Sequence, residues 1–407
     1  LGEMNMDVHV ARQPIFDAKL NVFAYELLFR QKVADAYDGK DGDKDTNCVI
    51  VNSFLLMGIQ CLTNGKRAFI NFTGNAIKGN IPRRLSKDLI AVEILEDVVP
   101  DGEIIKACRE LKKRDYMLVL DDFVCLERFS AIIPLIDMVK IDFRLVQAGK
   151  RKELVRTLEE YPVKFLAEKV ETYEEFAEAV KMGFSYFQGY FFCKPQLRSH
   201  RDIVEYKENH LQILQEIHQP EMRFSRIEKI VKRDVVLSYK LLKFINSSIF
   251  GLRSRIYSLR QAMLLLGEKE LKNWILLLAL KDIVHDKPRE ILVESLIRAK
   301  FCETMAADKM SPRAVENAFL IGIFSYLDVL LDRPMREVLD EIHLSKEIKA
   351  VLLGEENNQL ASLYRLAVSY EKADWKAYTK FAAEMNLEDN AVSQAYRKAV
   401  KWAGEIA

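Results

Sequence analysis

The first half of the chain alternates short apolar runs with amphipathic segments, and this alternation limits the possible folds more than any other feature. Apolar runs of strand length recur at intervals of roughly 20 to 25 residues, the spacing of strand–helix units. We expect strands at 22–29, 68–72, 89–94, 117–120, 138–141, 163–167 and 184–187. We expect helices at 48–62, 102–114, 151–161 and 173–182. This many units favours an α/β TIM-like barrel.

Polar side chains stand at or just past the ends of these apolar runs. They are Glu26, Asn71, Glu96, Asp121, Asp122, Asp142, Glu168 and Gln188. In a TIM-type barrel the carboxyl ends of the strands meet on one face, and functional residues gather there. Any one of these residues could simply begin a loop or cap a helix. The whole set indicates a site for a hard metal ion or for phosphate chemistry.

The second half, from about residue 200 onward, has helical periodicity and few strand candidates. Ser311-Pro312 is a helix start signal, and Gly267 is a natural helix stop. We therefore expect a barrel domain over residues 1–200 and an all-α helical bundle over residues 201–407.

The composition of the chain bears on its partners and on its location in the cell. The 61 Lys and Arg residues balance 60 Asp and Glu residues, so no global charge indicates a nucleic-acid partner. The six cysteines show no C-x-x-C spacing, and reduced thiols are expected. No apolar stretch is long enough to span a membrane, and no signal-peptide pattern opens the chain. We expect a soluble, cytoplasmic protein.

A series of dispersed motifs runs through the first half. In order, they are Gln13-Pro14-Ile15, Tyr25-Glu26-Leu27-Leu28-Phe29-Arg30, Asn71-Phe72-Thr73, Glu93-Ile94-Leu95-Glu96, Leu120-Asp121-Asp122-Phe123, Lys140-Ile141-Asp142, Ala167-Glu168-Lys169-Val170-Glu171, and Gln188-Gly189-Tyr190 with Pro195. The series resembles the signature of the EAL family of cyclic di-GMP phosphodiesterases. The second half resembles the HDOD domain at 241–248 and 256–267.

The EAL resemblance implies a metal centre. Glu26, Asn71, Glu96 and Asp121 would hold one divalent metal ion, and Asp121 would bridge to a second ion that Asp122 helps to bind. Oxygen ligands of this kind suit Mg²⁺ or Mn²⁺. In the helical half, Ser325-Tyr326 stands where related metallohydrolases have His-Asp, so no metal ion is expected there.

The same resemblance implies roles for residues around the metals. Lys140 would stabilise developing negative charge or orient the water, Glu168 would assist at the metal and water site, and Gln188 would position water. Gln13, Arg30 and Pro195 would contact the substrate. Glu171 would support the loop that follows Glu168.

The chain departs from the family pattern at this face. Val124 and a following Cys replace a glycine-containing loop after Asp122-Phe123, and Lys169 replaces a glycine. Consecutive strand residues point to opposite faces, so Asp121 and Asp122 can share one site only if the backbone bends between them. Glycine permits such bends, whereas a β-branched residue restricts them.

Three functions remain open from the sequence. The first is metal-dependent hydrolysis of cyclic di-GMP to linear pGpG, coupled to an HDOD module that binds an unidentified signalling protein. The second is a non-catalytic cyclic di-GMP receptor, which the altered loop after Asp122 supports. The third is a scaffold that binds no nucleotide. The resemblance also implies a homodimer, for which the altered loop predicts a different surface.

Overall fold

The computed structural model describes residues 8–31, 58–193, 241, 244–245, 256, 259–283, 288–341 and 344–406. Its described residues form two compact units. The first takes those within 1–194, 293–325 and 356–407, and the second takes those within 195–292 and 326–355. Helices late in the sequence group with the barrel in this clustering, and the domain boundary expected at residue 200 stays a prediction.

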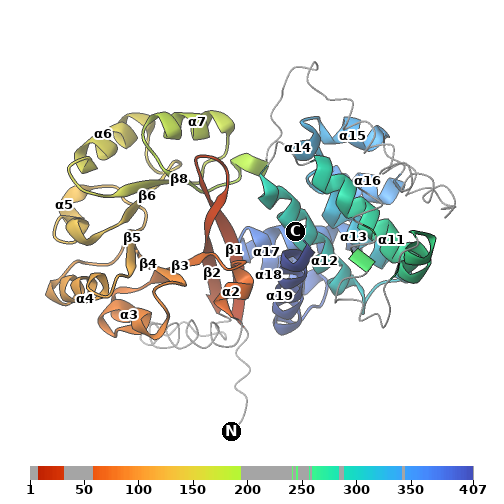
Figure 1. Ribbon diagram of the computed structural model, residues 1–407, viewed down its shortest axis with the longest axis horizontal. Coiled ribbons are helices and arrows are strands. Elements are labelled where there is room, and N and C mark those ends of the chain that lie inside the picture. The colour runs from red at the N-terminus through yellow and green to blue at the C-terminus, as the bar shows by residue number, and fades with distance from the viewer. Residues whose placement is uncertain are drawn as a thin grey trace, which may run out of the picture. The chain divides into compact units, whose positions relative to one another are not determined.

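Eight strands close a barrel in the first unit (Figure 1). They are β1 (Val8–Asp17), β2 (Val22–Gln31), β3 (Arg67–Phe72), β4 (Ile90–Ile94), β5 (Met117–Leu120), β6 (Met138–Asp142), β7 (Lys164–Glu168) and β8 (Tyr186–Phe187). Strands β2 to β8 run parallel to one another, whereas β1 is antiparallel to both of its neighbours, β2 and β8. The expected TIM-like barrel is confirmed.

Strand β1 is absent from the strands expected above. Pro14 lies within it and obscures the strand pattern, because proline donates no backbone hydrogen bond. The strand nevertheless pairs with β2 from Val8 to Phe16, with a register shift between Ile15 and Phe16. Its second half was therefore identified only as a motif, at Gln13-Pro14-Ile15, and not as a strand.

Short helices follow most of the parallel strands. They are α2 (Ile59–Leu62), α3 (Gly74–Lys78), η1 (Ile81–Arg84), α4 (Gly102–Lys112), α5 (Leu126–Phe129), η2 (Ile133–Leu135), α6 (Ala148–Leu158), α7 (Tyr173–Lys181) and η3 (Phe191–Cys193). Helix α4 shows why they form. Asp101 caps it by accepting hydrogen bonds from two backbone amides, and Ile104, Cys108 and Leu111 bury one face.

A layer of apolar side chains fills the middle of the barrel. Its fully buried members are Ile15, Ala24, Phe69, Ala91, Val119, Met138 and Leu166, one from each of the strands β1 to β7. Side chains alternate between the two faces of a strand. The residue two positions farther along each parallel strand, and two positions earlier on the antiparallel β1, therefore also points into the barrel, toward the carboxyl ends of β2 to β8.

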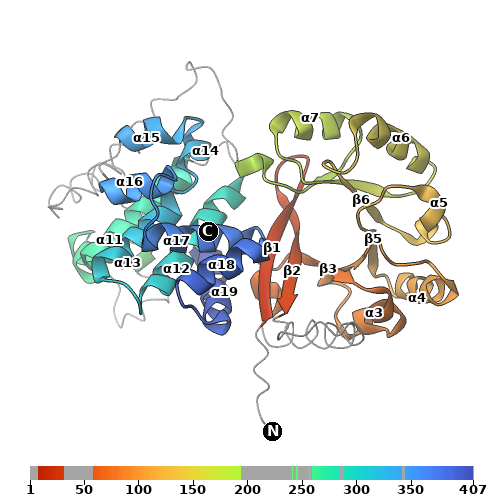
Figure 2. The same cartoon turned by 180° about the vertical axis from the view of Figure 1, so that it is seen from behind.

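The helices of the first unit that follow the barrel in sequence are α12 (Arg289–Ala306, in this unit from Val293), α13 (Pro312–Phe324), α17 (Gln359–Glu371), α18 (Trp375–Glu384) and α19 (Asp389–Ile406). The predicted Ser311 cap of α13 is confirmed, since its side chain accepts a hydrogen bond from Ala314. Helices α17 and α19 contact β1, and both views show them beside it (Figures 1 and 2). The amide of Val10 donates to the Tyr370 hydroxyl at 3.3 Å.

The second unit contains α11 (Leu259–Ile283), α14 (Leu327–Leu331), α15 (Met335–Glu341) and α16 (Lys346–Leu352). Gly267 interrupts α11 with a φ of 73°, in agreement with its predicted role as a helix stop. Most of the HDOD-like motif at 241–248 lies outside the described residues. None of the described helices is both long and apolar enough to cross a membrane.

Candidate active site

A layer of polar side chains lies directly next to the apolar layer, and each strand contributes one member. The members are Gln13, Glu26, Asn71, Glu93, Asp121, Lys140, Glu168 and Gln188, each two residues from an inward-facing position of its strand. Hydrogen bonds and ion pairs connect all eight. We call this set the polar layer. Seven of the eight, all but Glu93, line one cavity of about 710 Å³.

Lys140 lies at the centre of the polar layer and is only 1% exposed. Its Nζ atom lies 2.7 Å from Glu168, 2.9 Å from Asp121 and 3.5 Å from Glu26, and it forms a further ion pair with Glu93. Burial opposes the charge of Lys140, but the surrounding carboxylates raise its pKa well above the usual value. Lys140 therefore carries a positive charge in the metal-free protein.

Two side-chain amides orient Glu26. Asn71 donates to its Oε1 atom at 3.1 Å, and Gln188 donates to its Oε2 atom at 2.7 Å. The same amide nitrogen of Gln188 lies 3.1 Å from the Oε1 atom of Gln13. Strands β1, β2, β3 and β8 thus hold one carboxylate in a fixed orientation.

Strand β4 contributes Glu93 and not the predicted Glu96. Glu93 is fully buried and pairs with Lys140, whereas Glu96 is exposed in the turn after the strand. The two residues lie three positions apart, and strand side chains alternate with a period of two, so they cannot both face the barrel interior from one regular strand. Both glutamates belong to the motif Glu93-Ile94-Leu95-Glu96, and the alternation of side chains along β4 places the first of them, Glu93, in the barrel interior.

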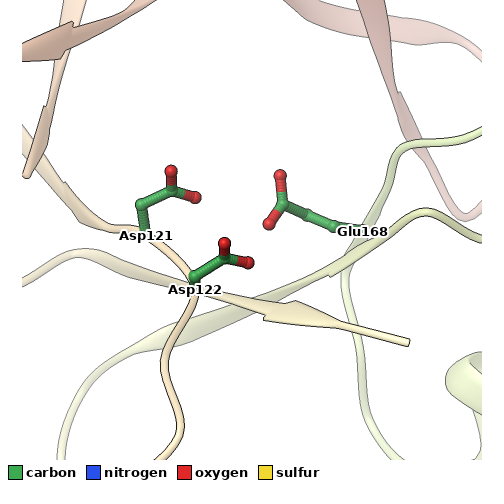
Figure 3. Close-up of side chains that lie close together, drawn as sticks. All are labelled: Asp121, Asp122 and Glu168. Atoms are coloured by element: carbon green, nitrogen blue, oxygen red, sulfur yellow. The ribbon is translucent and has the colours of Figure 1, made fainter. Parts of the chain in front are cut away.

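The carboxylates at the ends of β5 and β7 converge. Asp121, Asp122 and Glu168 each have an oxygen within 4.8 Å of the others, and Figure 3 shows the three side chains pointing toward one another. Asp122 has a φ of 39°, which supplies the backbone bend that a shared site requires. The bend forms without the glycines of the family pattern.

A residue with positive φ also follows the polar-layer residue of two other strands. Lys169 follows Glu168 with a φ of 52°, and Gly189 follows Gln188 with a φ of 144°. Only Gly189 is sterically required, because a Cβ atom there would lie 2.1 Å from the carbonyl oxygen of Val170. Sharp turns directly after the polar layer therefore bring loop residues over the cavity.

The polar layer suits a bound cation. Buried oxygens of Asn71 and Asp122 and the Oε2 atom of Glu93 accept no hydrogen bond within the described part of the chain, whereas Glu93 Oε1 and Asp121 Oδ1 lie beside the Lys140 ammonium. Buried oxygens without donors are costly unless a cation satisfies them. Burial raises the pKa of Glu168 to about 8, and burial together with the Asp121 charge raises the pKa of Asp122.

The remaining predicted residues have different positions. Glu171, predicted to support the loop after Glu168, lines the cavity and pairs with Arg144 at 2.7 Å. Asp142 is buried and accepts a hydrogen bond from the backbone of Leu145 at 3.1 Å, so it caps the turn after β6. The Arg30 side chain and Pro195 lie outside the described residues.

Known proteins resemble both halves of the chain. Residues 46–195 match the EAL domain model, and residues 205–361 match the HDOD domain model. The protein YuxH of Bacillus subtilis (strain 168) is 38% identical over 407 residues, which cover 98% of each chain. The cyclic di-GMP phosphodiesterase CdgJ of Vibrio cholerae serotype O1 is 37% identical over 401 residues, which cover 98% of this chain and 93% of CdgJ.

A solved structure also shows a partial likeness. It is the EAL enzyme Bd1971 in its cAMP and cyclic-di-GMP bound form, which is 19% identical with a TM-score of 0.40, over 47% of this chain and 62% of that chain. The two relatives that align along nearly the whole length, together with the two domain matches, show that this chain belongs to the family of proteins that join an EAL domain to an HDOD domain.

Proposed function

We propose that this chain hydrolyses cyclic di-GMP to linear pGpG in a reaction that depends on a divalent metal ion. The observation that carries the proposal is the polar layer, in which four carboxylates share the ammonium of Lys140 and a buried oxygen of Asn71 accepts no hydrogen bond within the described residues. Seven members of this layer line one cavity. CdgJ, a cyclic di-GMP phosphodiesterase by name, is related to this chain along nearly its whole length. The chemistry of the layer and this relationship support the same activity.

The metal-binding residues follow from the layer. Glu26, Asn71, Glu93 and Asp121 would hold one divalent cation, with Glu93 taking the role predicted for Glu96. Asp121 would share a second cation with Asp122 and Glu168, whose oxygens cluster. Oxygen ligands suit Mg²⁺ or Mn²⁺. Such ions, when bound, activate water and neutralise charge at a phosphodiester.

The other residues of the layer prepare the site. Lys140 supplies a fixed positive charge among the carboxylates, which favours the extra negative charge that develops on a phosphodiester under attack. Gln188 holds Glu26 in the orientation needed of a ligand. Gln13, Arg30 and Pro195 stay predicted substrate contacts, and a homodimer and the HDOD partner stay predictions.

Turnover of cyclic di-GMP by the purified full chain tests the proposal. With Mn²⁺ or Mg²⁺, chromatography should show pGpG appearing as cyclic di-GMP disappears. Glu93→Gln should lower the rate by more than about 100-fold, because losing a ligand costs more than losing an outer-shell partner. Glu96→Gln, the matched control three residues away, should leave the rate within about threefold because Glu96 is exposed.

The same experiment separates the alternatives. Tight binding of cyclic di-GMP without pGpG formation would identify a receptor, and the enzymatic proposal would then be wrong. Absence of binding with and without metal ions would leave a scaffold. A rate lost in Glu96→Gln and kept in Glu93→Gln would contradict the assignment of the metal ligand on β4.

A further inference from the structure

The turn between α17 and α18 reaches the cavity that holds the polar layer. Lys372, Ala373 and Trp375 line this cavity together with Glu26 and Asp121, and all of them belong to the first compact unit. The turn lies beyond both matched ranges, 46–195 for the EAL domain and 205–361 for the HDOD domain. One wall of the candidate active site therefore comes from a segment outside both domain models.

The backbone on both sides of Lys372 is firmly held. Glu371 is buried and receives hydrogen bonds from the guanidinium of Arg298, including one of 3.0 Å from Nε. Asp374 caps α18 by accepting from the amide of Ala377 at 3.0 Å. The ring of Trp375 packs edge-on against Tyr370 at 5.5 Å. The exposed side chain of Lys372 thus extends from a fixed position.

Lys372 differs from the other cations that line the cavity. Lys140 is held by the carboxylates of the polar layer, Arg144 pairs with Glu171, and Lys169 pairs with Asp142. Among the cavity-lining side chains that the structure describes, Lys372 is the cation with no ion pair. Its ammonium lies 5.1 Å from the ring centre of Tyr190, two residues after Gln188.

An anionic substrate needs such a cation. Cyclic di-GMP carries two phosphates, and only one of them can lie at the carboxylate-rich polar layer while it is cleaved. The other phosphate, like the first, is repelled by unneutralised carboxylates in the same cavity. A free ammonium on the cavity wall can donate charge-assisted hydrogen bonds to it.

We propose that Lys372 binds the phosphate of cyclic di-GMP that is not being cleaved, so that the helices after the HDOD match complete the substrate site. This inference rests on the proposed function and assigns part of its substrate recognition to the turn between α17 and α18. Lys372 acts as a specificity-determining residue, because a phosphodiester with a single phosphate offers it no second phosphate to bind.

Steady-state kinetics of the full chain with Mn²⁺ test this assignment. Lys372→Ala should raise the KM for cyclic di-GMP about tenfold or more, the effect of losing one charge-assisted hydrogen bond, and leave kcat within about twofold. Lys372→Glu should raise it further, and Lys372→Arg should retain most of the affinity. Hydrolysis of bis(p-nitrophenyl) phosphate, which has one phosphate, should be unchanged in all three variants. Lys376→Ala is the control, because Lys376 is exposed near the start of α18 and does not line the cavity.

The outcomes separate this inference from the proposed function. If the unmodified chain hydrolyses cyclic di-GMP and the Lys372 variants keep its KM, the inference is wrong and the proposed function stands. A loss of bis(p-nitrophenyl) phosphate hydrolysis in Lys372→Ala would also overturn the inference, since it would show a general effect on the site. If the unmodified chain binds cyclic di-GMP without turnover, the same comparison is made with dissociation constants.

Discussion

Replacing Lys140 by Met tests whether its charge balances the carboxylates of the polar layer in the metal-free protein. The Lys140 ammonium lies within 3.5 Å of Glu26, Asp121 and Glu168 and also pairs with Glu93. Methionine fills similar space without charge. Removing one partner of a buried ion pair costs about 3–5 kcal/mol, because the remaining charge is left uncompensated. For a unit of this size the loss corresponds to a Tm lower by roughly 5–15 °C.

Calorimetry of the full chain in EDTA measures this loss of stability, and the size of the loss should depend on pH. Lys140 lowers the pKa values of Glu93 and Glu168, so its removal raises both further. A carboxyl whose folded-state pKa is raised favours folding at low pH, and this contribution is lost as pH rises through that pKa. The Tm difference between Lys140→Met and the unmodified chain should therefore widen as pH rises above about 8, where Glu168 ionises in the unmodified chain and stays protonated in the variant.

Two further measurements make the reasoning refutable. Mn²⁺ should recover much of the lost Tm in Lys140→Met, because a divalent cation supplies the missing charge. Lys164→Met, at an exposed lysine of β7, should change stability by less than about 0.5 kcal/mol. Equal Tm values for Lys140→Met and the unmodified chain in EDTA, or a loss independent of pH, would show that Lys140 does not balance the layer.

Two other predictions concern the loops and the acids of the site. Between pH 5 and pH 8.5 the metal-free chain should lose stability, because the pKa of Glu168 is about 8 in the folded protein and near 4.5 when unfolded. Glu168→Gln should flatten this decline in a calorimetric pH series. An unchanged slope in the variant would contradict the prediction. Gly189→Ala should lower the Tm and displace Gln188, since its Cβ atom would overlap the Val170 carbonyl and a φ of 144° costs about 1–3 kcal/mol. Near-native Tm and activity in Gly189→Ala would refute the close approach.

Sequence patterns predicted much of the barrel because strand signals are local. The runs at 117–120 and 138–141 correspond closely to β5 and β6, and the bend needed after Asp121 exists at Asp122. Strand β1 was missed because Pro14 weakens its strand pattern, although its antiparallel partner β2 follows it directly in the sequence.

Of the four residues predicted to hold the first metal ion, the structure brings Glu26, Asn71 and Asp121 into the polar layer but not Glu96, and their roles as ligands stay predictions. Glu96 matched a motif by position, but the inward face of β4 carries Ala91 and Glu93. Counting by twos along the strand would have selected Glu93, so the signal was present in the sequence. No comparable signal exists for Lys372, because its contribution depends on helices that pack on the barrel from far along the chain.

The contact between β1 and the last helices has a consequence for how the protein is made. The Val10 amide and the Tyr370 hydroxyl bond across a sequence separation of 360 residues, and His9 packs on Tyr378. During synthesis, β1 leaves the ribosome long before these partners exist. Contacts of such long range slow folding because the intervening chain must first be ordered. Nascent chains that stall before α17 should therefore hold a barrel whose β1 lacks the helices that pack on it, and late truncations should impair the EAL domain.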